Sequence, residues 1–233
     1  MILKMAGSLP QYIYAYDDKG IYINLFVGSQ AEIPFHGSEL YVRQTTGYPW
    51  RGVTKIELRT GHPAAFAVNI RIPGWAQGVE NPFGLYHSNL HGSVLLKVNG
   101  KKIDLHTVRG YASIRRTWKK GDVIELELPV GPRLISPGDS VETIKGKMAI
   151  AAGPIIYGLE GVDNPGLEHF QIGSDVPLAL SYKPGLLNGV NVITGKVKDG
   201  TGGEASFTAI PFYALGNRKP GAAYEVWVPE RGR

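Results

Sequence analysis

Residues 110–129, GYASIRRTWKKGDVIELELP, limit the fold of this chain more than any other stretch. Apolar residues take every second position both before and after residues 118–122, which is the period of a β-strand with one buried face. The interruption contains Gly121, a residue suited to a turn. Pro129 ends the second run, because proline cannot donate to a central ladder. The stretch therefore predicts two amphipathic strands joined as a β-hairpin.

The same alternation recurs along the chain at intervals of roughly 8–12 residues, which is typical of β-sandwiches. Asn99-Gly100 is the strongest two-residue hairpin signal. Sustained helical periodicity is absent after residue 10. The expected fold is all-β, with two consecutive antiparallel, jelly-roll-like β-sandwich domains and a short N-terminal helix remnant. Residues 131–138, GPRLISPG, mark the expected boundary, so the predicted parts are residues 1–10, 11–130 and 131–233.

Charge and composition exclude several classes of function. The 25 basic and 20 acidic residues give a net charge of +5, and the basic residues are scattered, which favours solvated strand faces over a nucleic-acid-binding stripe. No apolar run approaches the roughly 20 residues of a membrane span. The absence of cysteine excludes disulfides, thiolate zinc sites and cysteine nucleophiles within this chain, and it leaves the cellular compartment open.

Two pairs of carboxylates are candidates for an acid and a base. Glu125 and Glu127 share one strand face, and such a pair can meet the separation of about 5–10 Å that a glycosidase needs. An exposed strand face explains them better. Glu160 and Asp163 flank a turn after an apolar strand, where a turn or hydrogen-bonding role is favoured.

His87 and His91 have the four-residue spacing of a helical metal pair. They lie in a loop rich in glycine and asparagine, so the helical argument fails and no metal site is predicted.

Aromatic residues at strand ends and in loops are the remaining candidates. Exposed rings could stack on sugars, whereas buried rings would close the ends of a sandwich core, and the second interpretation is favoured. Tyr48, Trp50 and Trp75 are the predicted contacts with a sugar or with a neighbouring domain, and the Tyr48-Pro49-Trp50 loop is the best placed of them.

Several motifs, in order, resemble the C-terminal part of the β-L-arabinofuranosidase family of bacterial glycoside hydrolases, family 127. The resemblance runs over nearly the whole chain, and the ordered set is specific where single motifs are not. The motifs are IYINLF at 21–26, TTGYPW at 45–50, RIPGW at 71–75, VNG at 98–100, GYASIRRTWKKGD at 110–122, AGPIIY at 152–157, DN at 163–164, and IPFYA at 210–214 with NR at 217–218.

The resemblance implies a parent enzyme with an α/α-barrel catalytic domain followed by two β-sandwich domains. That enzyme would hydrolyse terminal β-L-arabinofuranosides or related plant sugars in carbohydrate metabolism. It would use a glutamate acid/base, a zinc held by cysteines and a glutamate, and a cysteine nucleophile, all in the barrel. Residues 1–11 would be the tail of the last barrel helix. No catalytic or metal-binding residue is carried over to this chain, and zinc is expected only in the barrel.

The function expected from the sequence is therefore a non-catalytic portion that braces the catalytic α/α-barrel and could support a homodimer. Two alternatives stay open. One is a stand-alone carbohydrate-binding module, and the other is a self-contained glycosidase that uses Glu125, Glu127 or Glu160.

Overall fold

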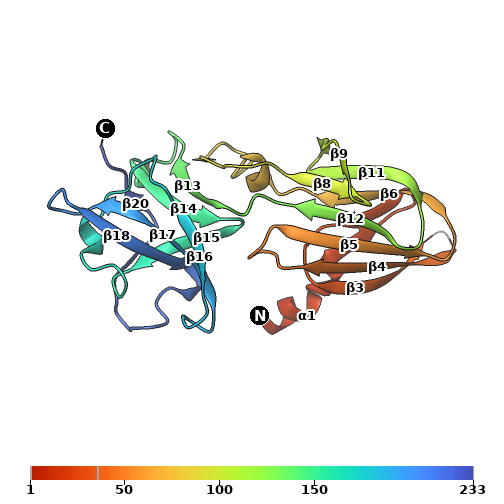
Figure 1. Ribbon diagram of the computed structural model, residues 1–233, viewed down its shortest axis with the longest axis horizontal. Helices are drawn as coiled ribbons and strands as arrows, with labels where there is room; N and C mark the ends of the chain where they lie inside the picture. The colour runs from red at the N-terminus through yellow and green to blue at the C-terminus, as the bar shows by residue number, and fades with distance from the viewer. Residues whose placement is uncertain (1, 36, 233) are drawn as a thin grey trace. The chain divides into compact units, whose positions relative to one another are not determined.

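A computed structural model describes residues 2–35 and 37–232, and this part of the chain is nearly all β, as the sequence predicts (Figure 1). Helical structure comprises two short N-terminal α-helices, α1 (Ile2–Ser8) and α2 (Pro10–Ile13), and the 3₁₀ turns η1 (Gly74–Gln77), η2 (Glu142–Ile144), η3 (Leu167–His169) and η4 (Phe212–Ala214). Within the described residues, no helix is long and apolar enough to cross a membrane.

The chain forms two compact units, and it passes between them more than once. The first unit comprises Met1–Gln77 together with Ser93–Pro129, and the second comprises Gly78–Gly92 together with Val130–Arg233, each taken over its described residues. Residues 78–92 join the second unit because their strand β7 (Tyr86–Ser88) pairs with β13 (Pro132–Pro137). A single boundary near residue 131 does not anticipate this excursion, since it leaves 78–92 in the first sandwich.

The first unit is a sandwich of two sheets. One sheet has the order β1 (Tyr14–Tyr16), β2 (Gly20–Ile23), β6 (Ala64–Arg71), β11 (Tyr111–Trp118), β10 (Thr107–Val108). The other has the order β3 (Ser29–Phe35), β4 (Ser38–Thr46), β5 (Val53–Thr60), β12 (Asp122–Glu127), β8 (Leu95–Val98), β9 (Lys101–Ile103). The β2–β6 pair is parallel, and the other described pairs of this unit are antiparallel.

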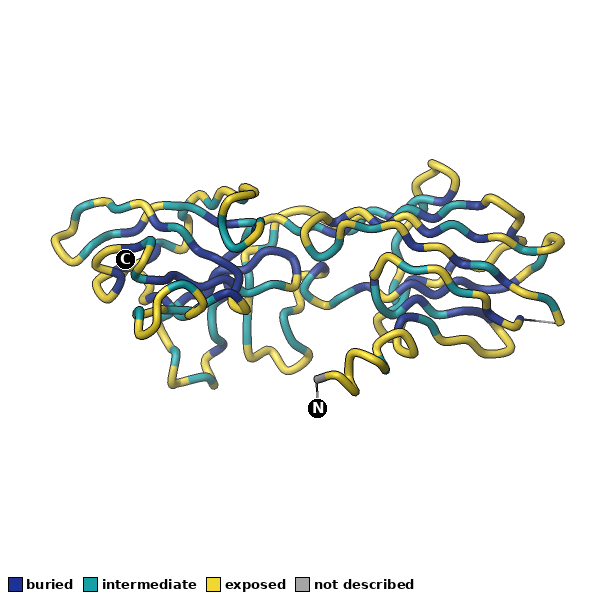
Figure 2. The backbone as a smooth tube through the Cα atoms, turned by 90° about the horizontal axis from the view of Figure 1, so that it is seen from below, coloured by how far each residue is buried: buried dark blue, intermediate teal, exposed yellow. Residues whose placement is uncertain are grey.

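Alternation along the strands decides which side chains form the core of this sandwich. On β5, Thr54, Ile56 and Leu58 are fully buried, and on β12 Ile124 and Leu126 are fully buried. Figure 2 shows the result as buried and exposed segments that alternate along neighbouring strands. The expected turn at Asn99-Gly100 is confirmed: it joins β8 to β9, with φ values of 50° and 77° that suit a type I′ hairpin.

The hairpin predicted for residues 110–129 is wrong. Strand β11 pairs with β6 and β10, whereas β12 pairs with β5 and β8, so the two strands lie in different sheets. The connection is an arch across the core. Alternation reports which face of a strand is buried, and an arch and a hairpin bury the same side chains. Trp118 occupies the crossing, with its indole Nε1–H donating to the Phe66 carbonyl at 3.1 Å.

Asp122 holds the turn of this arch together. Its carboxylate accepts hydrogen bonds from the Asn99 amide at 2.8 Å and from the Lys119 backbone N–H at 2.9 Å. Burial pushes the pKa of the carboxyl upward, but these donors and the nearby Arg116 guanidinium outweigh it, so the net pKa is below the usual 3.8. A carboxylate with a lowered pKa stabilises the fold above pH 3.8 and loses that contribution as the pH falls through its folded pKa.

Asp122→Asn is expected to cost about 1–3 kcal/mol at neutral pH, because an amide nitrogen replaces the oxygen that accepts the Lys119 N–H. Urea unfolding at pH 7 and pH 3 measures this, and the variant should lose less stability on acidification than the parent. Asp104→Asn, at an exposed position, is the control and should change neither value. An unchanged pH dependence in the Asp122 variant would contradict the assignment.

The second unit is built on one curled sheet. Its order is β16 (Ala179–Lys183), β17 (Val190–Lys198), β18 (Glu204–Pro211), β15 (Ile155–Glu160), β14 (Lys147–Ala152), β13, β7, with β19 (Tyr224–Glu225) added to β15 and β20 (Val228–Pro229) added to β14. The two apolar segments on either side of Gly153-Pro154 are β14 and β15, which pair with each other. The central strands are buried on both faces: Ile150 and Leu159 belong to the main core, and Ala149 and Ala151 face a second apolar cluster.

Candidate functional site

The aromatic loop, residues 47–52, connects β4 to β5 in the first unit and carries two of the predicted contact residues. The Thr46 hydroxyl accepts a hydrogen bond from the Tyr48 N–H at 3.0 Å, and the Trp50 N–H donates to the Gly47 carbonyl at 3.0 Å. The Tyr48–Pro49 peptide bond is cis. Local hydrogen bonds therefore define the path of this loop.

The structure brings Tyr48 and Trp75 together. The Tyr48 ring meets Phe26 edge to face at 5.6 Å between centroids, and the Trp75 indole N–H donates to the Tyr48 hydroxyl. Burial raises the pKa of Tyr48 above 10.0, and the bond from Trp75 opposes part of that rise. Trp50 differs from both, because 39% of its surface is exposed. Tyr48 and Trp75 are thus half-buried supports, and Trp50 is the ring that the loop presents outward.

Tyr48→Phe is expected to destabilise the first unit by about 1 kcal/mol, because the Trp75 N–H loses its acceptor. The raised pKa adds stability that is present below pH 10.0 and is lost as the pH rises through the folded pKa, so the difference between parent and variant should shrink above that pH. Urea unfolding at pH 7 and pH 11 measures both effects. Tyr16→Phe, at a residue 54% exposed, is the matched control; an equal loss in both variants would refute the role of the hydroxyl.

Glu160 and Asp163 do come together, but around an arginine. Glu160, 2% exposed at the end of β15, accepts from Arg218 Nε at 2.8 Å, and Asp163 accepts from Arg218 Nη1 at 3.0 Å. Hydrogen bonding to Asp163, and then to Glu160, raises the pKa of Arg218 above its usual value. Both carboxylates therefore share one guanidinium, which favours the structural role over acid/base work. Arg218 lies 58 residues from Glu160 in the sequence, and no local pattern marks it as their partner.

The other predicted carboxylates, Glu125 and Glu127, lie on one face of strand β12. Glu125 on β12 is opposite Lys55 of β5 and Lys97 of β8. Glu127 on the same strand is exposed. This is the arrangement of a solvated face.

His87 and His91 lie in different kinds of local structure, one on a strand and the other in a loop. His87 lies on β7 opposite Ser136, and His91 follows in an exposed loop. Among residues 2–35 and 37–232, no three His, Cys, Asp or Glu side chains form a group that could hold a metal ion.

The second unit contains an aromatic hollow of about 360 Å³ that sequence reasoning missed. Tyr86 and Trp227 stack at its wall, with centroids 5.8 Å apart and rings inclined by 26°. Glu80 lines the hollow and forms a buried ion pair with Arg133, whose Nε lies 2.7 Å from Oε1. Burial pushes the pKa of Glu80 upward, but Arg133 outweighs it and the net pKa is lowered. The hollow thus combines an apolar wall with one fixed carboxylate.

Comparison with known proteins also divides the chain into two parts, but it keeps residues 78–92 with the first part, whereas the structure assigns them to the second unit. The family model described as β-L-arabinofuranosidase, GH127 middle domain, matches residues 20–130, and the glycoside hydrolase family 127 C-terminal domain matches residues 132–229. A curated relative, the non-reducing end β-L-arabinofuranosidase of Bifidobacterium longum subsp. longum, is 26% identical over 94% of this chain. The chain spans only 35% of that relative's length.

Solved structures agree. A GH127 β-arabinofuranosidase superposes with a TM-score of 0.87 and 33% identity over 96% of this chain and 37% of its own. A GH127 β-L-arabinofuranosidase from Geobacillus stearothermophilus T6 has the same TM-score at 31% identity, over 99% of this chain and 36% of its own. Since two domain models of one family match residues 20–130 and 132–229, the chain belongs to glycoside hydrolase family 127, and these residues correspond to that family's middle and C-terminal domains.

Proposed function

We propose that this chain is the non-catalytic β-sandwich portion of a β-L-arabinofuranosidase and that it braces a catalytic α/α-barrel domain. One observation carries the proposal: the chain matches the middle and C-terminal domain models, yet it spans about a third of the length of its relatives. The hydrolysis of β-L-arabinofuranosides or related plant sugars would then belong to the part of the relatives that this chain does not match.

The carboxylates of this chain support a non-catalytic role. A glycosidase needs an acid and a base or nucleophile that flank the scissile bond and are free to exchange protons. Here Glu160 and Asp163 are bound to one guanidinium, and Glu125 lies between cross-strand lysines. Zinc held by cysteines, which the family resemblance implies, does not fit this chain, because its 233 residues include no cysteine.

The aromatic loop is the surface we propose for contact with the barrel. Tyr48 and Trp75 stabilise the loop from within, and Trp50 presents an exposed ring. Partly exposed tryptophans on ordered loops are frequent anchors of domain interfaces.

Hydrolysis of p-nitrophenyl β-L-arabinofuranoside tests the absence of catalysis. The chain alone should give no turnover, with or without added zinc, under conditions in which the full-length Bifidobacterium enzyme is active. Turnover that survives purification and is abolished by Glu160→Gln or Glu125→Gln would overturn the proposal and place the chemistry in this chain.

A chimera tests the bracing role. This chain would replace the matched 35% of the Bifidobacterium relative, and Trp50→Ala would be compared in the chimera and in the chain alone. We expect the variant to lower the thermal stability of the chimera's catalytic part and to leave the chain alone nearly unchanged. Val108→Ala, at a residue 60% exposed in the same unit, is the control. Equal behaviour of the Trp50 and Val108 variants in the chimera would count against the contact.

Carbohydrate binding is a second candidate, favoured by the exposed ring of Trp50. Stacking on a sugar would change the tryptophan fluorescence in a saturable way on addition of arabinan oligosaccharides, and Trp50→Ala would remove the change. A flat titration would eliminate this candidate.

A further inference from the structure

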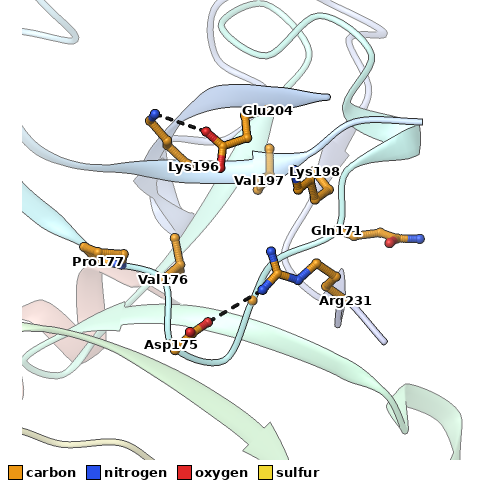
Figure 3. A pocket seen from close by; sticks show the side chains of 10 residues that line it. Gln171, Asp175, Val176, Pro177, Lys196, Val197, Lys198, Glu204 and Arg231 are labelled. Atoms are coloured by element: carbon orange, nitrogen blue, oxygen red, sulfur yellow. Dashed lines mark hydrogen bonds and ion pairs between the residues drawn. The ribbon is translucent and has the colours of Figure 1, made fainter. Parts of the chain in front are cut away.

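A second hollow in the second unit, of about 420 Å³, differs from the aromatic one because charged side chains line it (Figure 3). We call it the basic hollow. Its size falls in the range of about 300–1,000 Å³ that is usual for small-molecule sites. The side chains that carry the argument are those of Gln171, Asp175, Lys196, Lys198, Glu204 and Arg231.

Backbone hydrogen bonds fix the positions from which two of the cations project. Gln171 and Lys198 exchange both N–H···O bonds at 2.9 Å, and the Arg231 N–H donates to the Ile172 carbonyl at 2.9 Å. Ile172 is fully buried and anchors the segment between them. Lys198 and Arg231 are thereby pinned to adjacent residues of one short segment.

The charges in the basic hollow do not balance. Lys196 Nζ lies 3.2 Å from Glu204, and Arg231 Nη2 lies 3.9 Å from Asp175, which is too long for a hydrogen bond. Lys198 forms no ion pair within the described residues; its charge helps to lower the pKa of the adjacent Asp199, a carboxylate that does not line the hollow. Three cations thus face two carboxylates, and one of the two pairs is loose.

Two further observations support a shared positive field. The hydrogen bond from Lys196 lowers the pKa of Glu204, and the charges of Lys196, Lys198 and Arg231 lower it further. The positive charges of these three side chains therefore act together on the Glu204 carboxylate. Gly173 leaves room beneath the loose pair: a Cβ there would lie 3.0 Å from Asp175 Oδ1 and 3.5 Å from Arg231 Nη2.

We infer that the basic hollow binds an acidic sugar, a hexuronate residue, through its carboxylate. Lys198 supplies the unmatched charge, and the planar fork of Arg231 suits a carboxylate. Gln171, Asp175 and Glu204 can hydrogen-bond the ring hydroxyls. Val176 and Pro177 line the same hollow and offer an apolar wall to the C–H face of the ring. The choice of a sugar rests on the proposed function, whereas the choice of an anion rests on the charges alone.

Titration of the ¹⁵N-labelled chain with sodium D-galacturonate at low salt tests the inference. Saturable amide shifts are expected around residues 171–173 and 196–198, and the affinity should fall when salt is raised, because salt screens the attraction. Galactose, which has the same ring without the charge, should shift nothing, and acetate and inorganic phosphate should bind at least roughly tenfold more weakly.

Variants localise the site. Lys198→Gln and Arg231→Gln should each weaken galacturonate binding roughly tenfold, as expected for loss of one charge-assisted hydrogen bond. Gly173→Ala, which removes no charge, should weaken it by crowding Asp175 and Arg231. Lys4→Gln, in the first unit, is the control. Unchanged amide dispersion away from the hollow shows that each variant is folded.

Each outcome decides one element of the inference. If galacturonate binding does not saturate, or if galactose binds equally well, the proposed binding site is refuted. If acetate or phosphate binds as tightly as galacturonate, the hollow is a simple anion site and the assignment of a sugar ligand is refuted. Because binding is measured without catalysis, failure here leaves the accessory role intact. Conversely, hydrolysis by the chain would overturn the accessory role and leave the binding result in place.

Discussion

Trp118→Ala is expected to destabilise the first unit by about 3–5 kcal/mol, the range for removing a large buried aromatic side chain. Trp118 is fully buried where the chain crosses from one sheet to the other, and its ring lies 6.1 Å from that of Phe66. Alanine would leave a cavity and would also leave the Phe66 carbonyl without its indole donor.

Urea unfolding followed by amide NMR measures the effect, because resonances of the two units report separately and tryptophan fluorescence would itself be altered. The transition of the second unit serves as the internal reference. Trp50→Ala is the matched control: it deletes the same side chain from an exposed loop and should cost at most about 1 kcal/mol. A loss below about 1 kcal/mol for Trp118→Ala would mean that the arch is not a packed part of the core.

Arg218→Met should destabilise the second unit by about 3–5 kcal/mol, because it removes the partner of a buried carboxylate. Glu160 is 2% exposed, and the Arg218 side chain is 16% exposed. Methionine retains most of the apolar volume but none of the donors, so the charge of Glu160 would be left without its cation. The loss of folding stability arises more from the unpaired buried charge than from the net stability that the intact ion pair contributes.

Two comparisons isolate this mechanism. Lys196→Met breaks an ion pair whose side chains are 66% and 56% exposed, and it should cost at most about 1 kcal/mol. The double variant Glu160→Gln with Arg218→Met should recover part of the stability, because no charge is then buried alone. If the double variant is less stable than Arg218→Met, burial of charge is not the cause.

The sequence predicts the strands of this fold better than their partners. Ile124 and Leu126 have the alternation of a half-buried strand, and they are buried. That alternation carries no information on whether Tyr111–Trp118 turns back to pair with them or crosses the core, and it crosses. Where the turn itself encodes the pairing, as at Asn99-Gly100, the prediction holds.

The same contrast between local pattern and long-range pairing applies to the residues of the candidate sites. Tyr48 and Trp75 are marked by composition as loop aromatics, and they meet. Arg218 with Glu160, and Arg133 with Glu80, are pairs formed across 58 and 53 residues by the path of the chain. Arg218 belongs to one of the family motifs, but nothing local marks either arginine as the partner of a buried carboxylate, so only the folded chain identifies the two pairs.

The excursion of residues 78–92 determines how the protein can be cut. The covalent chain passes between the units three times, after Gln77, after Gly92 and after Pro129. A protease that cleaved only the last of these crossings would not release the second unit, because strand β7 would still be paired with β13 and still be continuous with the first unit at both ends. Expression of residues 130–232 alone would instead expose the β13 edge that β7 covers, and an uncovered edge promotes aggregation. The two units can be produced separately only if both are redesigned. The first unit needs residue 77 joined directly to residue 93, and the second needs residues 78–92 supplied together with residues 130–232.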